Sequence, residues 1–194
     1  MALTDDQGQA YGRVEALALE EVEMVLGRVE ITDRNHVVKA IDKTWFGAAL
    51  GPETQARLAE LARVVEVPAG THLLREGQPT EDLSILLSGR VALRMLVPER
   101  GMVTILTVEP GDLVGWSALV PPHRATSECV AVEPAVLLAF RGEELRATLR
   151  QEHALAASVD PRVLQAVARR LAATRFQLLD LFAQEPESSE VNPW

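Results

Sequence analysis

The stretch Gly111–Glu133, GDLVGWSALVPPHRATSECVAVE, decides how this chain is organised. It begins like a strand, breaks at Gly115, allows one short helical turn, stops at Pro121-Pro122 and resumes as a strand after Arg124. Backbone N–H groups at the start of a short helix, with an arginine a few residues on, are suited to holding an anion. The stretch therefore predicts an anion-binding loop set between β segments.

Composition narrows the class of protein. The chain has 194 residues, which suits one domain with an appendage or at most two small ones. Its formal net charge of −9 argues against nucleic acid as the main partner, because phosphate contacts need a clustered basic surface. No apolar run approaches the roughly 20 residues of a membrane helix. The first residues lack the basic start and apolar run of a signal peptide.

The single Cys129 excludes an intrachain disulfide and indicates a reducing, cytoplasmic setting. It lies in an apolar, strand-like run, which favours a buried, unreactive thiol. The four histidines are scattered along the chain and suggest neither a metal site nor a catalytic triad. We therefore expect no enzyme, no metal and no cofactor.

The first part of the chain predicts helices. Residues 1–10 are polar and expected to be frayed. Apolar residues at helical spacing predict a helix from Tyr11 to Gly27 and a second one after Thr32-Asp33. Gly51-Pro52-Glu53 opens a third helix, with proline at the first position, where its missing N–H costs nothing.

After Arg63 the pattern changes to short apolar runs that end at glycine- and proline-containing turns. The predicted strands are Val64–Val67, Thr71–Arg75, Leu83–Leu87, Arg90–Val97, Met102–Val108, Arg124–Val132 and Ala135–Phe140. Short strands at this spacing indicate an antiparallel sandwich or barrel. The expected fold class is mainly β, an antiparallel β-roll of the jelly-roll type with flanking helices.

Two helices are predicted to follow the strands. Gly142–Gln151 is short and charged, and Asp160-Pro161 is expected to cap and open a long helix that ends near Phe182. The long helix carries a narrow heptad seam of Leu164, Val167, Leu171, Thr174, Leu178 and Leu181. Such a seam suits a homodimer through Leu164–Leu181, or else the same stripe packs on the barrel. Residues 184–194 form an acidic tail that is expected to be disordered.

This order of elements resembles the cyclic nucleotide-binding domain of the cyclic-AMP receptor and Fnr family of bacterial regulators. The matching residues are Pro68-Ala69-Gly70, Arg75-Glu76-Gly77, Leu86 to Val91, Pro110-Gly111-Asp112 and Gly115 to Leu119. The resemblance divides the chain into a helical extension, 1–45, the nucleotide-binding-like domain, 46–183, and the tail. Only twelve residues follow Phe182, too few for the helix-turn-helix domain of such regulators, so no DNA binding is expected.

The resemblance also implies a binding site. The short helix would present the N–H groups of Gly115, Ser117 and Ala118 to a cyclic phosphate, with Ser117 helping to cap the helix. Arg124 is the candidate phosphate partner, because a guanidinium donates parallel hydrogen bonds to phosphate oxygens. Thr126 and, on the long helix, Thr174 complete the candidate set.

Two departures from the family pattern bear on binding. Trp116 stands where the family has a glutamate that takes the ribose hydroxyl, and indole has no acceptor for that bond. Trp116 either stacks on the ligand or fills the cavity. Counting back from Ala131-Val132-Glu133, the family's arginine position falls on Ala125, and a shift of one residue turns a strand side chain to the other face. Arg124 therefore either contacts phosphate, aided by a bulge near Thr126, or is a structural arginine.

Two functions stay open at this point. The first is a sensor that binds a cyclic nucleotide (cyclic AMP or cyclic GMP) or a related phosphate ligand and signals to a protein partner. The second is a module that no longer binds ligand and serves dimerisation or protein–protein interaction. Neither function involves a membrane.

Overall fold

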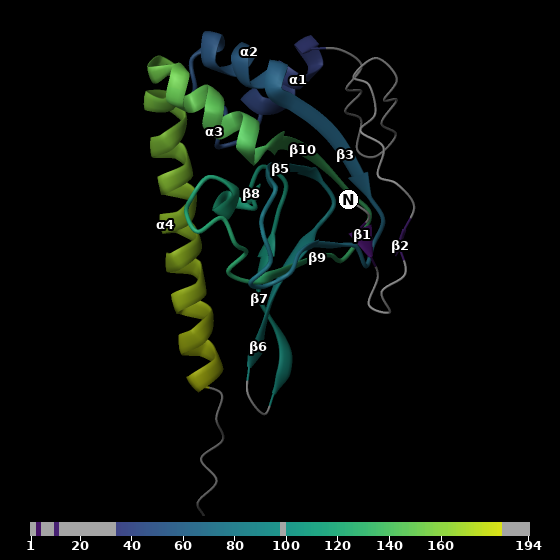
Figure 1. Ribbon diagram of the computed structural model, residues 1–194. Helices are drawn as coiled ribbons and strands as arrows, with labels where there is room; N and C mark the ends of the chain where they lie inside the picture. The colour runs from purple at the N-terminus through teal and green to yellow at the C-terminus, as the bar shows by residue number, and fades with distance from the viewer. Residues whose placement is uncertain (1–2, 5–9, 12–33, 98–99, 184–194) are drawn as a thin grey trace, which may run out of the picture.

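The computed structural model describes residues 3–4, 10–11, 34–97 and 100–183, with side chains described from 34 to 175 apart from 98–99. Eight strands form two four-stranded antiparallel sheets (Figure 1). The first sheet contains, in spatial order, β3 (Ala62–Val67), β10 (Ala135–Arg141), β5 (Asp82–Ser88) and β8 (Leu113–Val114). The second contains β4 (His72–Leu74), β9 (Glu128–Ala131), β6 (Val91–Val97) and β7 (Gly101–Val108). The predicted β-roll is confirmed.

Alternation along the strands gives the first sheet two buried faces. Val65, Leu86 and Leu137 face the second sheet and form the interior of the roll with Leu93 and Ile105. The opposite face of the same sheet packs against helices, so its strands are apolar on both sides. The second core contains, among others, Val64, Leu83, Ile85, Leu138 and Phe140 together with helix residues Ile41, Leu58, Leu145 and Val159. Strands that are buried on both faces read as continuous apolar runs, which is the pattern of VLLAF in β10.

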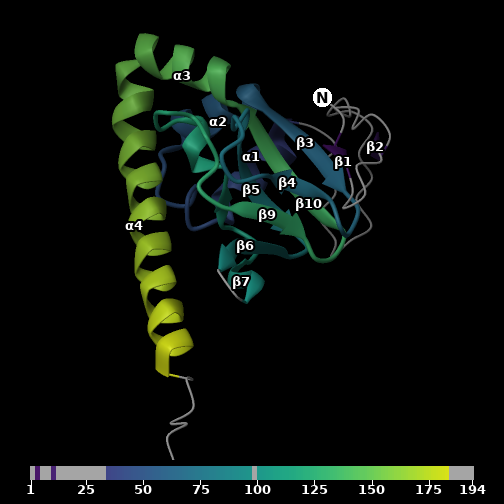
Figure 2. The same cartoon turned by 60° about the horizontal axis from the view of Figure 1, so that its bottom comes forward.

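The helices lie at one side of the roll. They are α1 (Arg34–Asp42), α2 (Pro52–Leu61), the short 3₁₀ helix η1 (Trp116–Ala118), α3 (Gly142–Gln151) and α4 (His153–Ala183). Both views show α4 running along the side of the roll (Figures 1 and 2). Pro52 begins α2 as predicted, and α1 covers the second predicted helix. In the part of the chain that the structure describes, no helix is long and apolar enough to cross a membrane.

The start of the long helix was predicted wrongly. The helix α4 begins at His153, so Asp160 is not its cap and Pro161 lies inside it. Leu155 and Val159, which precede the proline, are 5% and 0% exposed. Burial of these two side chains in the helix-side core stabilises the extra turns and outweighs the single backbone hydrogen bond that Pro161 cannot donate.

The buried residues of α4 are not those of the predicted seam. Val163 and Ala166, which lie outside the seam, face the core, whereas the seam residues Leu164 and Leu171 are 69% and 61% exposed. The alternative that the seam packs on the barrel is therefore wrong for these two leucines. The side chains of Leu178 and Leu181 lie outside the described residues. Dimerisation through the seam stays a prediction.

One of the predictions for residues 1–27 is wrong, and the others are not tested. Leu3–Thr4 and Ala10–Tyr11 pair as the short strands β1 and β2, so Tyr11 does not begin a helix. The rest of the predicted helix to Gly27 and the acidic tail 184–194 lie outside the described residues.

The strand predicted at Arg124–Val132 is shorter than expected. β9 begins only at Glu128, and Arg124 makes one isolated bridge to Pro79. The ladder cannot continue along this partner because proline has no N–H to donate. Ala125 instead exchanges hydrogen bonds with the turn, from its N–H to the Gln78 carbonyl and from the Gly77 N–H to its own carbonyl.

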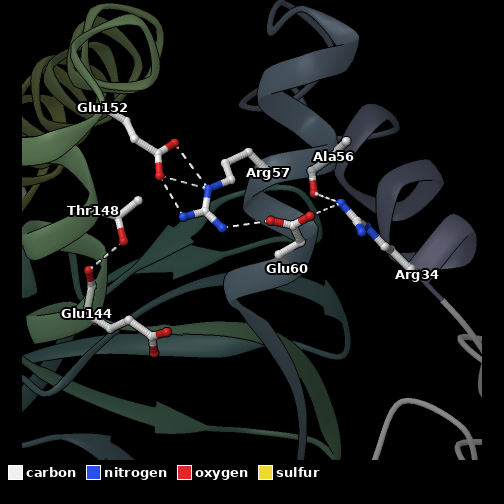
Figure 3. Close-up of polar contacts among 7 residues, drawn as sticks. All are labelled: Arg34, Ala56, Arg57, Glu60, Glu144, Thr148 and Glu152. Carbon is white, nitrogen blue, oxygen red and sulfur yellow. Dashed lines mark hydrogen bonds and ion pairs between the residues drawn. The ribbon is translucent and has the colours of Figure 1, made fainter.

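A cluster of ion pairs joins the helices that cover the sheet (Figure 3). The guanidinium of Arg57 on α2 donates to both carboxylate oxygens of Glu152, at 2.6 to 3.1 Å, and to Glu60 at 2.7 Å. Arg34 on α1 pairs with the other oxygen of Glu60. The cluster thereby ties α1 and α2 to the α3–α4 junction.

Candidate functional site

The turn after β8 has the shape that the sequence predicts. Gly115 adopts a left-handed conformation, with φ of 76°, and η1 follows at Trp116–Ala118. A Cβ at Gly115 would lie 2.3 Å from the carbonyl oxygen of Asp82, so only glycine fits this close approach. The 3₁₀ turn then ends with a hydrogen bond from the Leu119 N–H to the Trp116 carbonyl.

The side chain of Ser117 does not make the contact that the sequence predicts. The N-terminus of η1 carries no side-chain cap, so the expected capping by Ser117 is wrong. Its hydroxyl is buried and lies 2.9 Å from the hydroxyl of Thr80. The backbone N–H of Thr80 also donates to the carbonyl of His123. Thr80 thus fixes η1 and the segment before Arg124 to the same point of the chain.

The carbonyl end of η1 is held by two side chains. Arg146 on α3 donates to the carbonyl of Ala118, and the His123 ring nitrogen Nδ1 lies 3.3 Å from the carbonyl of Ser117. Ala118 itself is fully buried. These contacts fix the turn in one geometry.

Arg124 points to the surface. Its guanidinium donates to the carbonyl of Gly77 at 2.7 Å and is exposed, while Ala125 beside it is buried. The two neighbours therefore lie on opposite faces, as the one-residue offset predicts. Thr126 is exposed as well. The structure shows no bond between Arg124 and the described residues of η1, so the phosphate role of Arg124 stays a prediction.

Trp116 is half-buried and packs against the helix-side core. This position matches the cavity-filling alternative for its indole. A ligand-stacking role for Trp116 is not tested by this contact.

Arg170 is a candidate that no sequence motif singles out, because two consecutive arginines on a helix are most often a solvated face. Arg170 is partly buried on α4, and its guanidinium donates to the carbonyl of Leu113 at 2.9 Å, two residues before Gly115. Burial lowers its pKa, and the Asp112 carboxylate opposes that shift by charge attraction, although among the described residues no ion pair joins the two side chains. The sequence contains a pattern that places Arg170 on the inward face of α4, because Val163, Ala166 and Arg170 recur at helical spacing.

Thr174 lies one turn beyond Arg170 and is half-buried. Its hydroxyl donates to the Arg170 carbonyl at 2.8 Å. Arg169 lies on another face of the helix, over the ring of Trp45, whose indole N–H donates to Asp112. The two consecutive arginines thus both connect α4 to the strand that leads into η1.

Cys129 is buried inside the roll, as expected, and burial raises the pKa of its thiol to about 12. In the described part of the chain, no cluster of histidine, cysteine and acidic residues is arranged to hold a metal ion.

Comparison with known proteins agrees with this geometry. Residues 64–152 match the family model of the cyclic nucleotide-binding domain. The chain is 27% identical over 131 residues to a CRP-like cAMP-activated global transcriptional regulator of Mycobacterium tuberculosis, covering 67% of this chain and 56% of that protein. It is 30% identical over 121 residues to the Pycsar effector protein XpPycTIR of Xanthomonas perforans, covering 62% and 37%.

Solved structures agree with the same assignment. The N-terminal domain of a transcriptional regulator from Streptomyces coelicolor is 29% identical, with a TM-score of 0.56 over 70% of this chain and 94% of that one. A cyclic nucleotide-binding domain from Methylobacillus flagellatus is 22% identical, with a TM-score of 0.66 over 76% and 83%, and shares the fold. Residues 64–152 are therefore similar to a cyclic nucleotide-binding domain, and the relatives of the chain include a CRP-like regulator. The chain spans about half the length of the Mycobacterium relative.

Proposed function

We propose that this domain is a regulatory sensor, not an enzyme, that binds a cyclic nucleotide or a related phosphate ligand and signals to a protein partner. The ligand's phosphate would lie at Gly115, Ser117 and Ala118, with Arg124 and Thr174 contributing from the neighbouring segment and from α4. The expected ligands are cyclic AMP and cyclic GMP, and the expected setting is the cytoplasm.

The observation that supports the proposal most is that Arg170 has, in the described part of the chain, few hydrogen-bond partners for a partly buried charge. A guanidinium has five N–H donors, and among the described residues Arg170 has one hydrogen-bond acceptor, the backbone carbonyl of Leu113. A partly buried cation without a close ion pair is costly in the free protein, and Asp112 offsets that cost only by attraction through space. An anionic ligand at the adjacent turn would add a closer counter-charge, which supports binding of a phosphate there.

The contact between Arg170 and the Leu113 carbonyl also suggests how ligand binding would change the rest of the domain. A phosphate that draws Arg170 toward itself competes with the carbonyl of Leu113, and this competition changes how α4 sits on the roll. A ligand that binds one setting of α4 better shifts the population toward it. Because Leu164 and Leu171 are exposed on α4, the shift would reach a second copy of the chain through the predicted seam.

A second candidate, a module that no longer binds ligand, is favoured by a specific observation. Arg124 is bonded to the carbonyl of Gly77 and the Ser117 hydroxyl to Thr80, so both candidate groups have partners without ligand. Trp116 supplies no acceptor for a ribose hydroxyl. In this alternative the roll and α4 serve assembly alone.

Thermal unfolding with excess cyclic AMP or cyclic GMP separates the two candidates. A ligand present at about 100 times its dissociation constant adds roughly 2.7 kcal/mol to the free energy of unfolding. We expect this shift in the parent protein, a smaller one in Arg170→Met and Arg124→Met, and the full shift in Arg150→Met, whose arginine is exposed on α3. If neither nucleotide shifts the parent protein, the cyclic-nucleotide sensor is wrong and the assembly module is favoured.

A further inference from the structure

A cavity of about 350 Å³ opens between the first sheet and β4, and Val114, which directly precedes Gly115, is among its lining residues. None of the candidate nucleotide-binding residues lines it. Its walls come from the inward face of the first sheet and from β4, and its mouth lies beside the end of α2 and the start of α3. The volume lies within the range of small-molecule pockets, roughly 300–1,000 Å³.

Strand register explains why space remains there. On the inward face of the first sheet, Leu137 is paired with Val65 and forms an apolar floor. In the next inward row, Ala139 is paired with Arg63 on one side and with Ser84 on the other. Alanine and serine are too small to fill this row, so the cavity opens above the floor. Leu73 and Leu74 of β4 close the opposite side.

The outermost row makes the mouth polar. Arg141 is paired with Asp82 across the strands, and Asp82 also forms an ion pair with Arg63. Glu81 and Glu144 complete the rim. Two guanidiniums therefore face three carboxylates, and one cation is already neutralised by its partner. A rim of mixed sign favours no strongly charged group, whereas its donors and acceptors suit a neutral polar one.

We propose that this cavity is a second ligand site, which takes a small molecule with an apolar body and an uncharged polar head. The body lies against Leu137, Val65 and Leu74, and the head reaches the Ser84 hydroxyl and the rim. The cavity is lined by none of the candidate nucleotide-binding residues, but its lining residues Val114 and Asp82 lie directly beside Gly115.

A matched pair of fluorescent probes tests the proposal on the full chain. N-phenyl-1-naphthylamine is neutral, and 8-anilinonaphthalene-1-sulfonate has the same aromatic body with a fixed negative charge. We expect saturable binding of the neutral probe at one site per chain, and binding of the sulfonate weaker by roughly tenfold or more, a difference of about 1.4 kcal/mol.

Variants locate the site. Ala139→Leu and Ser84→Met fill the middle row, and we expect each to weaken the neutral probe by roughly tenfold or more, with a melting temperature equal to or above that of the parent. Ala154→Leu adds the same volume as Ala139→Leu at an exposed position of α4 and should bind like the parent. Because methionine adapts its shape, Ser84→Met keeps the test valid if Ala139→Leu does not fold.

Three outcomes would overturn the proposal. They are equal binding of the two probes, unchanged affinity in a folded Ala139→Leu or Ser84→Met protein, and loss of binding in Leu171→Asp instead. The last result would place the probe on the exposed seam of α4.

Discussion

The guanidinium of Arg169 lies 4.5 Å from the centroid of the Trp45 ring, while the indole N–H of the same tryptophan donates to Asp112 Oδ1 at 3.1 Å. One side chain therefore connects three segments: the chain after α1, the turn before β8, and α4. The turn before β8 leads directly to Gly115. We expect a change in the position of α4 to affect the candidate site through this contact as well as through Arg170.

Replacing Trp45 with phenylalanine removes the indole donor but keeps an aromatic face for Arg169. We expect Trp45→Phe to lower the free energy of unfolding by about 1–2 kcal/mol, because the bond to a carboxylate is lost. Urea denaturation measures this change. A double-mutant cycle with Asp112→Ala isolates the bond, and a coupling energy near zero would show that the hydrogen bond does not contribute to stability.

The ion-pair cluster at Arg57 predicts a pH dependence. Hydrogen bonds from Arg57 lower the pKa of both Glu152 and Glu60. A carboxyl group whose folded pKa is depressed contributes stability above its unfolded pKa, near 4.3, and loses it as the pH falls. We expect Arg57→Met to have a lower melting temperature than the parent at about pH 7, and to lose less stability as the pH falls from about 6 to about 3, through that unfolded pKa. Thermal unfolding followed across this range measures both profiles.

Salt provides the control for the Arg57 cluster, since these side chains are more than a third exposed. Screening should reduce the difference between Arg57→Met and the parent in about 1 M sodium chloride. Arg150→Met removes an exposed arginine from α3 and should change neither profile. A difference that persists unchanged in salt would mean that Arg57 acts by packing.

Cys129 should react slowly while the protein is folded. Its thiol pKa is raised to about 12, so the thiolate is scarce at about pH 8, and the sulfur is buried. Labelling with a thiol-specific disulfide reagent should be slow in buffer and fast in denaturant. Because the pKa of this thiol is higher in the folded than in the unfolded protein, the protonated thiol stabilises the fold fully below the unfolded pKa. This stabilisation is lost as the pH rises through about 12. Cys129→Ser should show no fast labelling in buffer or in denaturant, which confirms that the reagent reacts with Cys129.

The exposed seam of α4 predicts the oligomeric state. Leu171→Asp places a charge at a position that is 61% exposed in the single chain, so the fold should tolerate it. We expect a dimer for the parent and a monomer for Leu171→Asp by sedimentation velocity. Ala172→Asp adds the same charge on the neighbouring face, away from the seam, and should remain dimeric. A dimer that persists in Leu171→Asp would rule out this seam as the main contact.

Trp116 offers a test by gain of function. Trp116→Glu introduces the carboxylate that the family resemblance implies, close to the strand held by Arg170. We expect tighter binding of cyclic AMP, measured by calorimetry, and a lower melting temperature because the indole no longer packs on the helix-side core. Trp116→Gln controls for the lost indole. Equal affinity in the two variants would show that a carboxylate at this position does not meet the ligand.

The β-roll, the helices at Pro52 and Gly142, and the turn at Gly115–Ala118 can be predicted from the amino-acid sequence alone. These features follow from local rules, since strand alternation, proline at a helix start and glycine with positive φ depend on a few neighbouring residues. Three features could be read only from the folded chain: α4 begins at His153, Arg124 bonds to Gly77, and Arg170 faces the strand before Gly115. Each of these outcomes depends on contacts between segments far apart in the chain, where burial and the choice of hydrogen-bond partner outweigh local preference.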